Sequence, residues 1–317
     1  MKNPSAGPHP LAQGKSERAL VTRSLLAACG MYIMWGGVLP LYWRSIRGIG
    51  PWETLAHRIL WGAALLLITV GPRTIVSTVR AVWAQPGRRS YAVLGALIIG
   101  SNWLIYIWGV RQSRMTEASL GYYIGPLLSM VLGRLVLKEP LRPLQGLATA
   151  CAAAGVGCLV VRHGAMPVFG LALAGTFSAY SLVRKLSGLK GMQGFIVETA
   201  LLSPLALVLL AALHLRGEAL FWAAPRATQV LLMGSGLLGS VPLVLFGVAA
   251  QHLRLTTLGI LQFLAPTLGL LMAVFVFNEV LDTTLWLTFG GIWAALALWI
   301  ADSVWVASRP AARPPLR

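Results

Sequence analysis

Charged side chains are scarce in this chain. Lysine, arginine, aspartate and glutamate make up 11% of its 317 residues, and nine residues are acidic. Soluble domains carry about 25% charged residues, whereas this chain is 57% hydrophobic with a mean hydropathy of +0.73. The composition argues against a water-soluble domain. It predicts an all-α polytopic membrane protein.

The sequence also lacks the motifs of several catalytic and metal-binding classes. It contains no GxxxxGK[ST] phosphate loop, no GxSxG nucleophile turn and no HExxH metal helix. Cys29, Cys151 and Cys158 lie within apolar runs and have no metal-ligand spacing, which is typical of small packing residues. We therefore expect no metal, no cofactor and no ATP hydrolysis in this chain.

A net charge of +17 does not by itself indicate a nucleic-acid partner. The basic residues form short clusters between apolar runs, and no basic stripe interleaved with aromatic residues is present. Clusters of this kind are the ordinary topology signal of a membrane protein. The expected partners are therefore the lipid bilayer and a small-molecule solute, not nucleic acid.

Ten apolar segments have about the ~20 residues that a membrane-crossing helix needs. They cover residues 22–42, 53–71, 90–110, 117–137, 143–161, 167–184, 194–213, 228–249, 255–277 and 284–305. Ten spans place both termini on one side, where the tails and loops hold 18 Lys and Arg against 7 on the other side. This bias predicts that both termini lie in the cytoplasm, with residues 1–20 as a disordered tail rather than a signal peptide.

A long internal repeat divides the chain into two halves. The stretch at 118–161, two apolar runs joined by a charged turn, recurs at 256–301. Matched positions are 140 residues apart: Pro126 with Pro266, and Glu139 with Glu279. Because each half holds five spans, an odd number, the second half must enter the membrane from the opposite face. Inverted repeats are a common plan of secondary transporters, which bind their solute near the midplane between the halves.

Several segments together resemble one known family. They are YIMWGGVLPLYW, ETLAHRILWG, GSNWLIYIWGV, EASLGYYIGPLLSMVLG and RLTTLGILQFLAPTLGLLMAVF. The pattern resembles the RarD group of EamA-type permeases, in the drug/metabolite transporter (DMT) superfamily, over about residues 20–305. The turn from Glu139 to Gly146 and the small-residue helix around Gly155 are similar to the EamA motif. RarD members are usually named for chloramphenicol sensitivity.

The resemblance implies two five-helix EamA repeats in the inner membrane, moving small metabolites or drugs. We divide the chain accordingly into a tail at 1–20, repeat 1 at 21–161, repeat 2 at 162–306 and a cytoplasmic tail at 307–317.

Four of the ionisable residues within the predicted spans are candidates for function. Glu53 and His57 are four residues apart on one helix face, and Arg58 lies roughly 8 Å deeper than Glu53. Glu198 is the repeat equivalent of Arg58. Charges inside a membrane usually face a cavity or a partner, so we expect Arg58 and Glu198 to contact solute. The alternatives are that Arg58 extends to the outer interface and that Glu198 forms a packing ion pair with a neighbouring basic residue.

We expect protons as a candidate coupling ion, carried by Glu53 with His57 or by Glu198. Arg58 and Glu198 should lie in opposite leaflets, about 15 Å apart along the membrane normal. Arg58 would then attract anionic groups from outside, and Glu198 would face the cytoplasmic mouth of one central cavity. Glu139 and Glu279, at span ends, are predicted to be turn and cap residues.

Polar and aromatic residues cluster at matched depth in four spans and predict a cavity with an apolar, adaptable wall. The predicted solute-binding residues of this kind are Trp35, Asn102, Tyr106, Tyr122, Tyr123 and Gln262. Each proline frees a carbonyl four residues earlier, so Pro126 and Pro266 are predicted hinges. Plain helix packing is the alternative for any single aromatic.

The leading interpretation is a secondary transporter working by alternating access around this cavity. The alternatives are a membrane-embedded enzyme acting on lipid or polyprenyl substrates, and a scaffold or channel that does not transport. The enzyme would need clustered acids or histidines at one membrane face, or a metal motif, and neither is present in the sequence.

The charge bias makes a direct prediction about topology. In a variant without the native cysteines, a cysteine introduced near Arg47 or Arg216 should react with a membrane-impermeant thiol reagent added outside. A cysteine near Arg88 or Lys190 should react only after the membrane is opened. The reverse labelling pattern would refute the predicted orientation.

Overall fold

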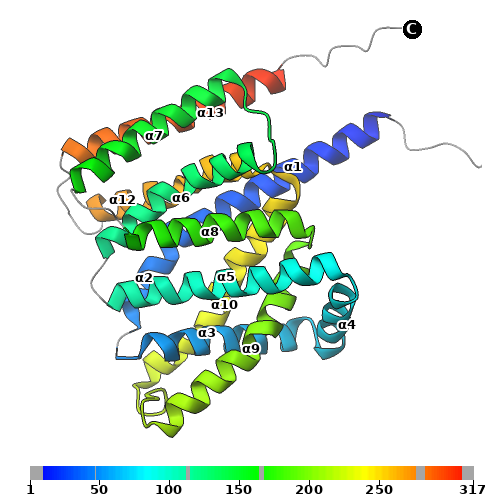
Figure 1. The fold of residues 1–317 in the computed structure, drawn as a ribbon, viewed down its shortest axis with the longest axis vertical. Coiled ribbons are helices and arrows are strands. Elements are labelled where there is room, and N and C mark those ends of the chain that lie inside the picture. The colour runs from blue at the N-terminus through cyan, green and yellow to red at the C-terminus, as the bar shows by residue number, and fades with distance from the viewer. Residues whose placement is uncertain (1–9, 47, 112–114, 164–167, 276–282, 309–317) are drawn as a thin grey trace, which may run out of the picture.

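The computed structural model describes residues 10–46, 48–111, 115–163, 168–275 and 283–308, and every regular element in these ranges is helical. In chain order they are α1 (Pro10–Ile33), the π-helix η1 (Met34–Val38), α2 (Leu39–Ser45), α3 (Pro51–Thr69), α4 (Pro72–Trp83), α5 (Pro86–Arg111), α6 (Met115–Leu135), α7 (Pro143–His163), α8 (Val168–Ser187), α9 (Gly191–Leu215), α10 (Arg226–His252), α11 (Leu255–Gln262), α12 (Leu264–Phe275) and α13 (Thr283–Ser308). Figure 1 shows α7 and α13 along one edge of the bundle and α3 and α9 toward the opposite edge.

Within the described residues, six helical segments are long and apolar enough to cross a membrane. They are Ala19–Trp43, Pro86–Trp108, Pro143–Arg162, Gly191–Leu215, Arg226–His252 and Trp286–Val306, all at predicted spans. A seventh results if α3 and α4, which meet at 109°, form one bent span. The other predicted spans coincide with α3, α6, α8 and the pair α11 and α12, so the count of ten remains a prediction.

Helix α4 occupies a region that we expected to be a loop. Gly71 precedes it with φ +81°, a conformation that glycine adopts without steric cost, and Pro72 begins the helix. Ile75, Val79 and Val82 follow each other at helical spacing and pack inward. We predicted a loop here because the segment is basic, although the spacing of its apolar residues indicates an amphipathic helix.

The helix contacts follow a pattern that an internal two-fold axis between the predicted halves would produce. Helix α5 contacts α8 as α10 contacts α1, and α3 contacts α10 as α9 contacts α5. Three further pairs join equivalent segments of the two halves: α3 with α9, α6 with α11, and α7 with α13. The two halves are therefore interleaved rather than placed side by side.

Glycines allow the closest of these contacts. A Cβ atom at Gly36, in η1, would lie 2.3 Å from the carbonyl oxygen of Ala265 in α12. A Cβ atom at Gly155, in α7, would lie 2.8 Å from the carbonyl oxygen of Thr288 in α13. Small residues let helix backbones approach each other closely in membranes, where packing rather than the hydrophobic effect drives association.

We predict that Gly36→Ala destabilises the protein by about 1–3 kcal/mol, because the added methyl group has no space against the Ala265 backbone. Gly37→Ala is the matched control, since a Cβ there would meet no atom within 4 Å. It should leave the stability unchanged or raise it slightly. Thermal unfolding in detergent measures both variants, and equal melting temperatures would contradict the close contact at Gly36.

Candidate functional site

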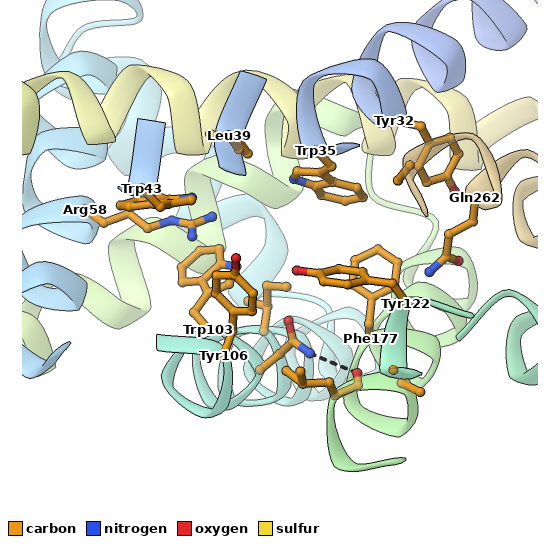
Figure 2. A pocket seen from close by; sticks show the side chains of 16 residues that line it. Tyr32, Trp35, Leu39, Trp43, Arg58, Trp103, Tyr106, Tyr122, Phe177 and Gln262 are labelled. Atoms are coloured by element: carbon orange, nitrogen blue, oxygen red, sulfur yellow. Dashed lines mark hydrogen bonds between the residues drawn. The ribbon is translucent and has the colours of Figure 1, made fainter. Parts of the chain in front are cut away.

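A cavity of about 110 Å³ lies between helices of both predicted halves. Its wall comes from α1, η1, α2, α3, α5 and α6 of the first half and from α8, α11 and α12 of the second. Seven of the 16 lining residues are aromatic, and Figure 2 shows them: Tyr32, Trp35, Trp43, Trp103, Tyr106, Tyr122 and Phe177. A wall of this kind suits a small, largely apolar molecule.

Arg58 is a buried cation at the cavity wall. Helix α3 begins at Pro51, so Arg58 lies two turns into the helix and is only 9% exposed. The carbon centre of its guanidinium is 4.1 Å from the Trp103 ring and 5.5 Å from the Trp43 ring. Contacts with aromatic faces stabilise a cation that has left water. Figure 2 shows Arg58 and Gln262 at opposite ends of the cavity, with aromatic rings between them.

Two amides supply polar groups to the wall. Asn102 Nδ2 donates to the carbonyl oxygen of Leu173 at 3.1 Å and to Thr176 Oγ1 at 2.8 Å. These bonds tie α5 to α8 and use the amide hydrogens of Asn102, so its Oδ1 is the group left to accept a hydrogen bond. Gln262 is the last residue of α11 and is 8% exposed.

Six of the eight predicted solute-binding residues line this cavity: Trp35, Arg58, Asn102, Tyr106, Tyr122 and Gln262. Sequence reasoning missed other residues that line it, among them Tyr32, Leu39, Trp43, Trp103 and Phe177. A signal for three of these was present. Tyr32, Trp35, Leu39 and Trp43 follow each other at intervals of three, four and four residues, which places them on one helix face.

Tyr123 does not line the cavity. It is 9% exposed and packs edge-on against Phe289 of α13, with ring centres 5.6 Å apart. Neighbouring residues of a helix point about 100° apart, so Tyr122 can face the cavity only if Tyr123 faces elsewhere. The structure therefore places Tyr123 in the packing between α6 and α13, and we do not propose it as a solute ligand.

Glu198 has protein partners of its own. It is 4% exposed, Tyr180 Oη donates to it at 3.0 Å, and Arg184 Nη1 lies 3.5 Å from its Oε1. A Cβ atom at Gly194 would overlap the Arg184 guanidinium, so this glycine makes room for the cation. The packing ion pair that the sequence left open is thus present.

Arg58 and Glu198 also share a feature. Both line a second cavity of about 20 Å³, next to the first. This volume is close to the space that one water molecule needs. We expected Arg58 and Glu198 to face opposite mouths of one central cavity. In the structure both instead border the same small cavity.

The carboxylate of Glu53 accepts backbone N–H bonds. Leu220 N and Phe221 N lie 2.8–3.0 Å from its oxygens. His57 Nε2 lies 3.9 Å from Glu53 Oε1, and its ring stacks on Phe221 with centres 4.4 Å apart. Glu53 therefore fastens α3 to the turn that precedes α10, and neither residue lines the two cavities described above.

Glu139 is a cap residue, as predicted. Its carboxylate accepts from Leu255 N at 2.8 Å, Thr256 N at 2.9 Å and Thr256 Oγ1 at 2.8 Å, at the start of α11. Lys185 Nζ lies 3.6 Å from Glu139 Oε1 and also donates to the carbonyl oxygen of Leu253. Glu139 thus joins the end of α6 to α11. Its repeat partner, Glu279, lies outside the described residues.

The two predicted hinge prolines differ in their surroundings. Helix α6 continues through Pro126 without a break. In the equivalent segment, the helix is interrupted at Phe263, three residues before Pro266, and this interruption separates α11 from α12. A proline cannot follow a regular helix without losing the bond to the carbonyl four residues earlier, here that of Gln262.

Comparison with known proteins identifies relatives of this chain. Residues 22–161 match the model of the EamA-like transporter family. An uncharacterized transporter of Pseudomonas aeruginosa is 42% identical over 291 residues, covering 90% of this chain and 95% of that protein. Protein RarD of Escherichia coli strain K12 is 34% identical over 287 residues, covering 90% and 97%. A crystal structure of a protein 21% identical to this chain superposes with a TM-score of 0.65 over 91% of this chain and 99% of that one, which shows a shared fold.

An all-helical membrane bundle of this fold, together with these relatives, defines a membrane transporter. The chain belongs to the RarD group of EamA-type permeases in the drug/metabolite transporter superfamily, because its relatives named RarD match it above 30% identity over nearly their whole length.

We predict that Arg184 and Glu198 are coupled in stability. Glu198→Ala should cost about 3–5 kcal/mol, since it leaves a buried cation without its counter-charge. The double variant Arg184→Ala with Glu198→Ala should cost less than the sum of the single variants, by more than about 1 kcal/mol. Denaturant unfolding in micelles measures the cycle. The comparison cycle, Arg58→Ala with Glu198→Ala, should show weaker coupling, and stronger coupling there than with Arg184 would contradict the pairing.

Proposed function

We propose that this protein is a secondary transporter that moves a small solute across the plasma (inner) membrane by alternating access. It would use ten spans in two inverted repeats, at 21–161 and 162–306, with both termini in the cytoplasm. The observation that carries the proposal is the aromatic cavity, whose wall is built by helices of both halves. Rocking one half against the other would change which side of the membrane reaches such a cavity.

Irregular backbone at the cavity supports this mechanism. The π-helix η1 contains Trp35, and the interruption at Phe263 follows directly after Gln262, so both irregularities place a side chain on the cavity wall. They also contact each other through Gly36 and Ala265. Within membranes, non-helical backbone is tolerated where it is buried in protein or lines a cavity, and broken helices are frequent at transporter binding sites.

A proton could be carried by Glu198, which borders the small cavity next to Arg58 and is held by Tyr180 and Arg184. We no longer propose Glu53, because backbone N–H groups occupy its carboxylate. The alternative of a membrane-embedded enzyme is less well supported, since the relatives are named as transporters or as RarD.

The proposal is tested by flux into proteoliposomes that contain the purified protein, with and without a pH gradient. Three single-ring probes of different charge are used: benzoate, benzamide and benzylamine. We expect at least one of them to enter faster than into empty vesicles. If all three enter at the rate seen in empty vesicles, transport of such solutes is refuted. An effect of the pH gradient on flux beyond its effect on empty vesicles would indicate proton coupling.

We predict that Pro126→Ala and Pro266→Ala slow this flux several-fold while the protein still inserts, because each restores a backbone hydrogen bond and stiffens its helix. Pro86→Ala is the matched control, since Pro86 is exposed at the first position of α5, where proline removes no helix bond. Wild-type rates in both variants would reduce the two prolines to packing residues.

A further inference from the structure

The two buried arginines of the bundle interior are satisfied differently. Arg184 is 4% exposed and pairs with Glu198, whereas Arg58 is 9% exposed and pairs with no acidic residue in the described part of the chain. The ion pairs found there are His57 with Glu53, Arg142 with Asp302, Arg184 with Glu198, and Lys185 with Glu139. A buried charge without a counter-charge is costly. A bound anion would therefore stabilise the buried Arg58 guanidinium.

The geometry around Arg58 leaves its hydrogen-bond donors available. Trp103 and Trp43 lie against the guanidinium, so apolar rings rather than acceptors occupy these positions. Figure 2 shows the guanidinium nitrogens of Arg58 directed toward the interior of the cavity. The N–H donors of arginine lie in one plane, in a fork that matches the two oxygens of a carboxylate.

The other residues of the cavity wall indicate which charge the solute carries. Among the described residues that line the cavity, Arg58 is the charged one, and the other polar groups are amides, tyrosine hydroxyls and tryptophan N–H groups. An ammonium group of a solute would therefore have no carboxylate to pair with among these residues. This disfavours cations and zwitterions as solutes. An anion would meet Arg58, and its body would meet aromatic rings.

The cavity also limits the size of the solute. An engineered cavity of about 150 Å³ binds benzene, and this cavity measures about 110 Å³. Space of this order limits the solute to about the size of a single ring. At the end opposite Arg58, Gln262 can hydrogen-bond a polar substituent on that ring (Figure 2).

We propose that the solute is a small organic anion, a carboxylate on a single planar ring, whose carboxylate binds the Arg58 guanidinium. This inference rests on the transport function proposed above, since it names the solute class of the same cavity. Arg58 then selects for the negative charge, and the aromatic wall selects for the flat, apolar body.

Binding is measured first, on purified protein in nanodiscs, by quenching of tryptophan fluorescence, because Trp35, Trp43 and Trp103 line the cavity. Benzoate is compared with benzamide, which has nearly the same shape without the charge. We expect wild-type protein to bind benzoate about 10- to 100-fold more tightly than benzamide, the range for a hydrogen bond to a charged group.

Variants separate charge recognition from loss of folding. Arg58→Gln should weaken benzoate binding by the same factor and leave benzamide binding within about twofold, which also shows that the cavity is intact. Arg58→Lys should lie between, because it keeps the charge and loses the fork. Arg89→Gln removes an exposed arginine outside the cavity and should bind benzoate like wild type.

The outcomes separate this inference from the proposed function. Equal binding of benzoate and benzamide, or unchanged benzoate binding in Arg58→Gln, overturns the anion assignment. Flux of benzamide or benzylamine in preference to benzoate also overturns it and leaves transport standing. Tight, Arg58-dependent benzoate binding without flux of any of the three probes supports the ligand class and refutes transport of such solutes.

Discussion

Backbone groups that leave a helix inside a membrane protein need partners within the protein, because lipid offers none. This constraint explains the two carboxylates that join the halves. Glu53, from the first half, accepts N–H bonds from the turn at 220–221, and Glu139, also from the first half, accepts them at the start of α11. Each carboxylate fastens the end of one helix to a turn of the other half.

The two buried arginines of the interior have different surroundings. Arg184 forms an ion pair with Glu198, which also accepts a hydrogen bond from Tyr180, and glycines at 194 and 247 leave room for the guanidinium. Arg58 is instead flanked by tryptophan rings and lies on a cavity wall. The difference follows from surroundings rather than residue type. Both are arginines in apolar helices, yet only Arg184 forms a direct ion pair with a carboxylate in the described part of the chain.

Much of the fold follows from patterns of the sequence, because apolar length and charge placement act locally. Most of the cavity wall was also predictable, since Asn102, Tyr106 and Tyr122 stand out as polar or aromatic groups at matched depth. The partner of Glu198 was not, because Arg184 of α8 meets Glu198 of α9 only in the folded arrangement of these helices. Tyr123 was wrongly grouped with Tyr122, since composition says which residues cluster but only helix rotation decides which of two neighbours faces inward.

The interruption at Phe263 has no counterpart in α6, which runs unbroken through Pro126. Two identical halves related by an inverted two-fold would give outward-facing and inward-facing forms of equal free energy. Here the two predicted halves differ, because α6 is continuous and α11 and α12 are separate helices. The two forms would then differ in free energy. Under the proposed alternating access, the chain itself would therefore set which form of the empty protein is more populated. The solute gradient still determines the direction of net flow, because a preference of the empty protein for one form supplies no energy for transport.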